Sequence, residues 1–375
     1  MLKLRKSIIE GIRNVAQIEE LHGFIQNAIE LEHATIPVYL TGLFSIKHGT
    51  NIDARNIVLS VVVEEMLHMS IASNLLNAVG GKPAINQPNF VPTFPGPLPM
   101  DVGEDRNLVA TLAPLTKKQI HDVFMAIEEP EHPLAIPVKL FSSPEQAALL
   151  DNDSSTNSEM LSNSTQEFST IGQFYHEIFL KLEALNKEQN IFTGDPKKQL
   201  VNTQWFPQDE LFAITNIEQA KRAIDIIVDQ GEGTSISPVD AQNKPAHYYR
   251  FGEILYGKRL VVDKSAKEGW AYAGEPVELD ASNILNLKQN AKATDYPEGS
   301  VARRYADQTN FTYSSLLNAL HETFNGNPAN IDAAMGLMYE LRLQVQKMVT
   351  INLGPNEQGI DEVAAPPFQF VTVNV

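Results

Sequence analysis

The chain has 375 residues, 43% of them hydrophobic, which is enough for a large core and for two compact regions. Its 46 Asp and Glu residues against 29 Lys and Arg give a formal net charge of -17, which argues against nucleic acid or an anionic membrane surface as a partner. Cysteine is absent, which excludes disulfide scaffolds, cysteine-bound zinc, iron–sulfur clusters and thiol nucleophiles and leaves Glu, Asp and His as ligands for any metal.

The N-terminus is basic, but no signal-peptide core follows it. No apolar run approaches the ~20 residues that a membrane span requires. We therefore expect a cytoplasmic protein without a membrane partner.

Two long helices are predicted near the start of the chain. Residues 17–47 carry apolar side chains at helical spacing, and Pro37 is expected to kink this helix beside Glu32. Residues 52–79 form the second helix, which ends at a Gly-Gly-Lys-Pro sequence. The helix breakers at residues 48–51 predict that the two helices fold back on each other.

The middle of the chain is predicted to be mostly loop. Residues 83–100 contain six prolines and indicate an extended segment over the bundle surface. Residues 117–128 predict a helix that ends at the following Glu-Pro-Glu-His-Pro. The polar, low-complexity stretch 151–166 indicates a mobile loop.

Further helices are predicted over 166–189, 217–230 and 245–257, followed by a mostly irregular stretch at 258–310 and by helices at about 311–325 and 330–350. Strand-like alternation is almost absent. The pattern therefore indicates a mainly α protein.

Glu32 and the run Glu65-Met-Leu-His68 lie at nearly equal distances from the breaker, so the two carboxylates come level when the helices fold back. Packed helix axes lie ~8–10 Å apart, which lets inward Glu side chains from both helices hold one ion. Residues three apart share a helix face, so His68 adds an imidazole beside Glu65. A Glu opposite a Glu-x-x-His is half of a ferritin-like dinuclear metal site.

A complete dinuclear site needs ligands from two further helices. The third long helix offers Glu177, with Gln173 on the same face, although Glu177 could equally be a surface charge. The fourth offers Glu232 or Asp229, and Glu232 could equally be a loop residue between glycines of a helix cap. His247 is a further candidate, with a hydrogen-bonded core histidine as the alternative.

Other side chains would support these ligands. Tyr39 lies two turns beyond Glu32 on the same face, which would suit a hydrogen-bonding or oxidisable phenol, although a tyrosine so placed is more often a core residue. Glu64 is expected to be solvated or to support a ligand. Arg250 is expected either to support the site or to pair with Glu253.

The motifs carrying these candidates resemble a known family. They are Glu32-His-Ala-Thr-Ile-Pro-Val-Tyr, Glu64-Glu-Met-Leu-His68, Ile171-Gly-Gln-Phe-Tyr175, Gln230-Gly-Glu-Gly233 and His247-Tyr-Tyr-Arg-Phe, followed by Tyr313-Ser-Ser-Leu-Leu, Phe324-Asn-Gly326 and Pro366-Pro-Phe-Gln-Phe. In this order they resemble the ferritin-like domain of iminophenylpyruvate dimer synthases, which couple two oxidised tryptophan units in violacein and chromopyrrolic acid biosynthesis. The domain also occurs in stand-alone proteins.

The resemblance implies a non-haem iron pair held by Glu32, Glu65, His68 and His247, with Glu177 or Gln173 and Glu232 or Asp229 in the remaining places. Family members often carry a Glu where this chain has Gln173, so one bridging carboxylate is expected to be missing or displaced. The dimer synthases are also much longer, so the tryptophan-coupling activity itself is not expected here.

We therefore expect a ferritin-like four-helix bundle over residues 15–258, with inserted loops at about 81–165, and a C-terminal extension over 259–375 packed on the bundle. Its helices would cover about 311–350. A homo-oligomer is left open.

The expected function is that of a dinuclear, metal-dependent oxidoreductase that acts on a small organic substrate with dioxygen or peroxide. Tyr39 or Tyr175 would shuttle a proton or an electron. Two irons are expected, with manganese as the alternative because Glu and His suit both metals. A manganese-catalase-like or ferroxidase activity, or a non-catalytic ferritin-like module, are the alternative functions.

Overall fold

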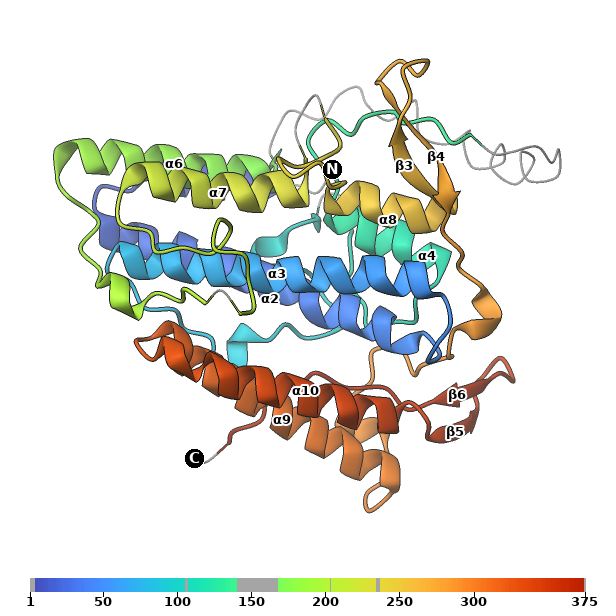
Figure 1. Cartoon of the computed structure of the whole chain (residues 1–375). Helices are drawn as coiled ribbons and strands as arrows, with labels where there is room; N and C mark the ends of the chain where they lie inside the picture. Colours follow the sequence, from blue (N-terminus) through green and yellow to red (C-terminus); the bar gives the residue numbers. More distant parts are fainter. Residues whose placement is uncertain (1–3, 105–106, 140–167, 203, 234–236, 374–375) are drawn as a thin grey trace.

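A computed structural model describes residues 4–104, 107–139, 168–202, 204–233 and 237–373. The loop predicted at 151–166 lies outside these residues. The described part of the chain is mainly helical, as expected, and its long helices lie in stacked layers (Figure 1).

The hairpin of α2 (Ile18–Ser45) and α3 (Ile52–Ala78) forms the middle layer (Figure 1). The turn between the two helices contains Gly49 and Asn51, whose φ angles are +79° and +45°. Glycine adopts this left-handed region without cost and Asn tolerates it, so the turn sequence permits the sharp reversal. The predicted hairpin is thus observed, and α2 continues as one helix through Pro37.

A second pair, α6 (Ile171–Glu188) and α7 (Ile217–Gly231), packs side by side over this hairpin (Figure 1). Thr170 and Gln173 form a capping box at the start of α6, and Asn216 caps α7. The caps explain why α6 begins a few residues later than the sequence pattern predicts. The four helices together form the expected bundle.

One end of the bundle is built by α8 (His247–Tyr256) and by the short α4 (Lys117–Gln119), which runs directly into the π-helical segment η4 (Ile120–Met125). α8 packs against both η4 and α3. The predicted helix at 117–128 is therefore present, but half of it, Ile120–Met125, has π-helical geometry, which occurs frequently at functional sites.

The C-terminal helices α9 (Val301–Phe324) and α10 (Ile331–Met348) form a layer on the other side of α2 and α3 from α6 and α7 (Figure 1). α9 begins ten residues earlier than predicted because Ser300 caps it by accepting a hydrogen bond from the Arg303 amide. The buried His33 ring is within 2.8 Å of the Tyr313 hydroxyl, which ties α2 to this layer.

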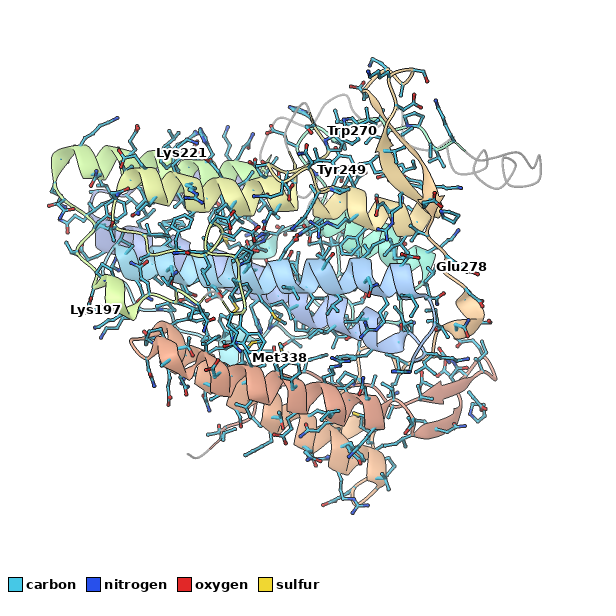
Figure 2. All side chains as sticks on the ribbon, viewed as in Figure 1. Lys197, Lys221, Tyr249, Trp270, Glu278 and Met338 are labelled. Carbon is cyan, nitrogen blue, oxygen red and sulfur yellow. The ribbon has the colours of Figure 1, made fainter. Side chains whose placement is uncertain are left out.

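Short elements lie around the bundle. The sequence analysis missed helix α1 (Lys6–Asn14) and the antiparallel hairpin of β3 (Lys258–Val262) and β4 (Trp270–Pro276), which falls in the stretch predicted to be irregular. Side chains from α8 and this hairpin form a small aromatic core beside the bundle, and Tyr249 and Trp270 mark it in Figure 2. The remaining strand pairs are β1 (Leu4–Arg5) with β2 (Phe168–Ser169) and β5 (Asn352–Pro355) with β6 (Asp361–Val363).

By length and composition, α3 could also cross a membrane, contrary to the sequence-based expectation of no such run. However, 72% of its most apolar window is buried inside the structure. That window's apolar character is accounted for by its central place in the bundle.

Candidate metal centre

A buried cluster of carboxylates and imidazoles lies among the bundle helices. Glu32 from α2 and Glu65 and His68 from α3 offer ligand atoms that all lie within 4.8 Å of one another. Glu65, Glu128 and His247 form a second group of the same dimensions. Glu65 belongs to both groups, so it lies where a carboxylate would bridge two ions. All five side chains are buried.

A fourth carboxylate, that of Glu232, lies at the same cavity. Glu232 follows directly after α7 and lines a cavity of about 50 Å³ together with Glu32, Glu65, His68 and Glu128. The predicted ligand Glu232 is therefore placed beside the cluster, whereas the alternative Asp229 does not line the cavity.

Two of the carboxylates are held by buried phenols. The Tyr175 hydroxyl donates a hydrogen bond to Glu32 Oε1, and the Tyr39 hydroxyl donates to Glu128 Oε1. Burial first, and then the nearby carboxylates, raise the pKa of both phenols well above its ordinary value, so both remain neutral donors at neutral pH. The other oxygen of each carboxylate faces an imidazole of the cluster.

The other two carboxylates, those of Glu65 and Glu232, also accept hydrogen bonds from neutral donors. Glu65 Oε2 accepts a hydrogen bond from the Thr35 hydroxyl at 3.0 Å, and Glu232 Oε1 accepts one from the Gly172 amide at 2.9 Å. Each of the four carboxylates thus has one oxygen fixed by a neutral donor. A ligand set oriented in this way needs little rearrangement to bind an ion.

The two histidines present the same nitrogen to the cluster. His68 Nδ1 lies 3.4 Å from Glu32 Oε2, while its Nε2 lies 2.9 Å from the side-chain oxygen of Gln230. His247 Nδ1 lies 2.9 Å from Glu65 Oε1 and 3.4 Å from Glu128 Oε2. The rings are stacked with centroids 5.5 Å apart. Both imidazoles therefore have Nδ1 available for a metal.

Behind His247 lies a buried ion pair. Its Nε2 donates to Glu64 Oε2 at 3.0 Å, and Arg250 donates to the same oxygen at 2.6 Å. Although burial opposes it, contact with His247 and Arg250 holds the pKa of Glu64 well below its usual range. Glu64 is thus the carboxylate that orients a ligand histidine. Arg250 pairs with it and not with Glu253, which binds Arg259.

The carboxylates and imidazoles of the cluster bind protons more tightly than free side chains do. Burial, and next the charge of Glu128, raise the pKa of Glu65 to about 7. Burial also raises the pKa of Glu232 to about 7. The neighbouring carboxylates raise the pKa of His68 and His247 against the effect of burial. Protons therefore stand in for positive charge at this site.

His247 Nδ1 gives a direct test of whether a metal fits. This atom is fully buried and has no hydrogen-bond partner among the described residues, although Glu65 and Glu128 oxygens are close to it. Those oxygens lie at hydrogen-bonding distance but not in hydrogen-bonding direction. Such an orphaned nitrogen beside carboxylates is the arrangement that a cation completes, so the residues present fit a metal ion.

Glu177 is the predicted ligand that the structure does not bring to the cluster. Its carboxylate pairs with Arg13 of α1 and does not line the cavity. Gln173 likewise acts elsewhere, since it caps α6 and donates to Glu131 at 2.9 Å. The ligand position expected from the third long helix is instead filled from the segment after η4, by Glu128.

Sequence reasoning missed Glu128. A signal was present, because Glu128 follows the apolar run Val123-Phe-Met-Ala-Ile127 at the end of a predicted helix. Glu65 stands in a similarly apolar setting. A Glu so placed is buried only when it is paired or bound to a metal.

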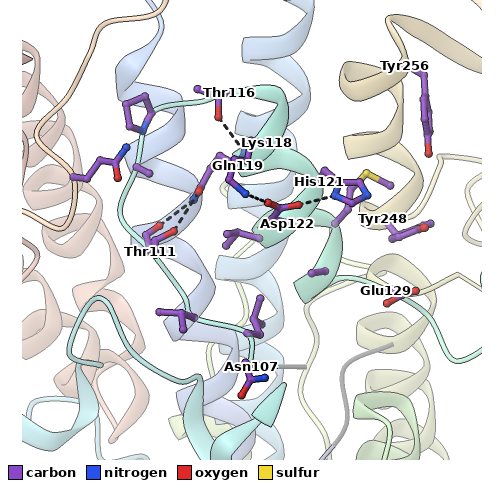
Figure 3. A pocket seen from close by; sticks show the side chains of 18 residues that line it. Asn107, Thr111, Thr116, Lys118, Gln119, His121, Asp122, Glu129, Tyr248 and Tyr256 are labelled. Atoms are coloured by element: carbon purple, nitrogen blue, oxygen red, sulfur yellow. Dashed lines mark hydrogen bonds and ion pairs between the residues drawn. The ribbon is translucent and has the colours of Figure 1, made fainter. Parts of the chain in front are cut away.

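A larger open cleft of about 760 Å³ lies on the other side of the same segment (Figure 3). Met125, Ala126 and Glu129 line this cleft, whereas Ile127 and Glu128 between them line the inner cavity. Tyr248 likewise faces the cleft, while the adjacent His247 joins the cluster. The segments that contain Glu128 and His247 thus line the cleft with one set of side chains and the cluster with another.

Comparisons with known proteins agree with this architecture. A family profile described as Ferritin-like matches residues 25–256. The crystal structure of a ferritin-like protein from Caulobacter vibrioides is similar, with a TM-score of 0.57 and 23% sequence identity over 88% of this chain and 95% of that chain. At this identity the likeness concerns the fold alone. No curated protein matches the sequence.

Proposed function

Since this chain belongs to the ferritin-like family, we propose that its buried cluster binds two metal ions, in the first place iron, and serves oxidative chemistry on small molecules. The observation that carries the proposal is the sharing of Glu65 between two ligand groups, each with its own histidine. Glu32 and His68 would hold one ion, Glu128 and His247 the other. Glu65 would bridge them, with Glu232 completing the set.

When bound, the ion pair would pass electrons from the organic substrate to dioxygen or peroxide, so that the substrate is oxidised and the oxidant reduced. The chain's own residues hold the ligands and the protons. Tyr175 and Tyr39 hold their protons on the phenol oxygens and donate hydrogen bonds to Glu32 and Glu128, so each phenol stands where it can pass a proton to its carboxylate when the charge of the cluster changes. Burial of the cluster excludes bulk water from the reacting atoms.

We propose a small organic substrate for this chemistry, in a stand-alone protein of the iminophenylpyruvate dimer synthase type. The support is the order of the motifs around Glu32, Glu65, Tyr175, Glu232 and His247. A manganese-catalase-like or ferroxidase activity is the second candidate, because a cavity of about 50 Å³ holds only a few water-sized molecules and so suits peroxide or a metal ion as the reactant.

Elemental analysis tests the metal site. The protein reconstituted with ferrous iron under reducing conditions should contain two irons per chain, and Glu65→Ala should lose both. Glu177→Ala is the matched control, since it removes a Glu that lies outside the cluster, and it should retain both irons. Two irons in Glu65→Ala would contradict the assignment. If the wild-type protein bound neither iron nor manganese, the non-catalytic ferritin-like module would be the one remaining function among those considered.

The reaction class is tested on the loaded protein. Consumption of dioxygen that requires an added organic reductant supports the first candidate. Disproportionation of hydrogen peroxide, or oxidation of excess ferrous iron without an organic reductant, supports the second.

A further inference from the structure

Among the residues that the structure describes, the partly exposed lining of the inner cavity lies on one side. Fourteen residues line it, and nine of them are buried. The five that are partly exposed all lie in the first turn of α6 or at the C-terminal end of α7, and we call them the mouth: Ile171, Gly172, Val228, Gly231 and Glu232. The cluster therefore meets solvent between these two helix ends and is closed elsewhere by buried side chains.

A glycine keeps the mouth open. A side chain at Gly231 would point toward the cluster, because its Cβ would lie 3.9 Å from Glu128 Oε2, the one atom of the described residues within 4 Å outside the neighbouring backbone. This is ordinary van der Waals distance, so a methyl group fits there without strain. A longer side chain would extend into the 50 Å³ of free space in front of the ligands.

At the opposite edge of the mouth, Gly172 leaves no room for a side chain. A Cβ at Gly172 would lie 2.8 Å from Glu232 Oε2, so the Glu232 carboxylate already fills the space beside Gly172. The free width of the mouth is thus set from the α7 side, by Gly231 and Val228.

The size of the cavity limits what can pass. One water molecule needs about 10–15 Å³ of free volume, so a cavity of 50 Å³ accommodates roughly four water molecules. Molecules of two or three non-hydrogen atoms and partly hydrated cations fit this space. A larger organic molecule can present only one end to it.

We infer that this mouth is the route by which metal ions and small oxidants reach the cluster, and that Gly231 sets the size of what enters. The inference rests on the proposed metal site, and it adds the access route and a residue that determines selectivity. It predicts that substitutions at the mouth change the rate at which metal ions and small oxidants enter, without changing the residues that bind the metal.

The test follows the entry of cobalt(II) into metal-free protein by its visible absorbance. Gly231→Leu should slow loading at least tenfold while the final content stays at two ions per chain. Gly231→Ala should load at nearly the wild-type rate, and Val228→Ala should load several-fold faster. Azide binding to the cobalt-loaded proteins should follow the same order of rates.

Matched substitutions outside the mouth serve as controls. Gly336→Leu on α10 places the same side chain where no atom lies within 4 Å, and Val301→Ala makes the same truncation at an exposed position. Both should load at the wild-type rate. Slowing by Gly336→Leu equal to that by Gly231→Leu would overturn the inference.

A second variant covers the case in which Gly231→Leu does not hold cobalt. Val228→Phe enlarges a side chain of the mouth at a second position and should also slow loading. Wild-type rates in Val228→Phe and Val228→Ala would overturn the access route while two bound cobalt ions still support the metal site. A wild-type protein that binds no metal would overturn the proposed function, and this inference with it.

Discussion

Glu64 accepts a hydrogen bond from His247 Nε2 at 3.0 Å on the side of the ring that faces away from the cluster. A carboxylate can only accept, so Nε2 keeps its proton, and the neutral imidazole that binds a metal would present the lone pair of Nδ1 to Glu65 and Glu128. The choice of tautomer thus follows from Glu64, which the sequence places beside the ligand Glu65.

Replacing this carboxylate by an amide should weaken metal binding. Glu64→Gln keeps the shape of the side chain but removes the charge that faces His247 and the buried Arg250. Loss of such a supporting partner costs about 10- to 100-fold in metal affinity. Competition with a chromophoric chelator measures this loss of metal affinity. Glu253→Gln disrupts the pair between another buried Glu and the partly exposed Arg259, so an equal loss of affinity there would contradict a specific role for Glu64.

The hydrogen bond from the Tyr39 phenol to Glu128 leads to a second prediction. Tyr39→Phe leaves a buried carboxylate oxygen without its donor, which costs about 1–3 kcal/mol of stability. Metal affinity should fall as well, because Glu128 is no longer held in place. Urea unfolding and chelator competition measure the two effects. Tyr296→Phe removes a buried phenol that bonds to Ala365, so it should lower stability but leave metal affinity unchanged. Unchanged metal affinity in Tyr39→Phe would contradict the supporting role.

The part of the site on α2 and α3 could be predicted because local geometry determines it. The two helices are joined by a six-residue connection, so counting residues from the turn places Glu32 level with Glu65. Helical periodicity then puts His68 on the same face as Glu65. Neither step requires knowledge of the rest of the fold.

The other half of the site depends on tertiary packing. Periodicity along α6 shows which face Glu177 occupies, but not that Arg13 of the unpredicted helix α1 lies opposite it. Glu128 reaches the cluster through a π-helical segment, whose extra residue per turn changes the face on which later side chains emerge. The β3–β4 hairpin was missed because short strands of mixed pattern are stabilised by the side chains packed on them.

The contact between Gly172 and Glu232 gives a third prediction. A methyl group at Gly172 would lie 2.8 Å from Glu232 Oε2, so Gly172→Ala should displace this carboxylate from its amide donor. The second ion should then bind about tenfold or more weakly, as for loss of a supporting contact. Isothermal titration with manganese(II) measures this affinity.

Gly23→Ala on α2 is the control, since nothing lies within 4 Å of its Cβ position. It should slightly stabilise the helix and leave binding unchanged. If Gly172→Ala binds both ions like the wild-type protein, Glu232 does not contribute a ligand.

The fourth prediction concerns pH. In the metal-free protein the pKa of Glu232 and of Glu65 is raised from 4.5 to about 7, so the folded state binds more protons than the unfolded state between these values. The raised pKa of His68 and His247 acts in the same direction above pH 6.5. Stability is therefore fully present near pH 4.5 and is lost as the pH rises toward and beyond 7.

Differential scanning calorimetry of the chelated protein should accordingly show Tm falling by several degrees between pH 5 and 7.5. One carboxyl with this shift accounts for roughly 3 kcal/mol. The metal-loaded protein should show the opposite slope, because ions compete with protons for the same ligands. Glu232→Gln removes one titrating group and should reduce the slope of the chelated protein. A Tm of the chelated protein that rises with pH over this range would show that the cluster carboxylates are already ionised without a metal.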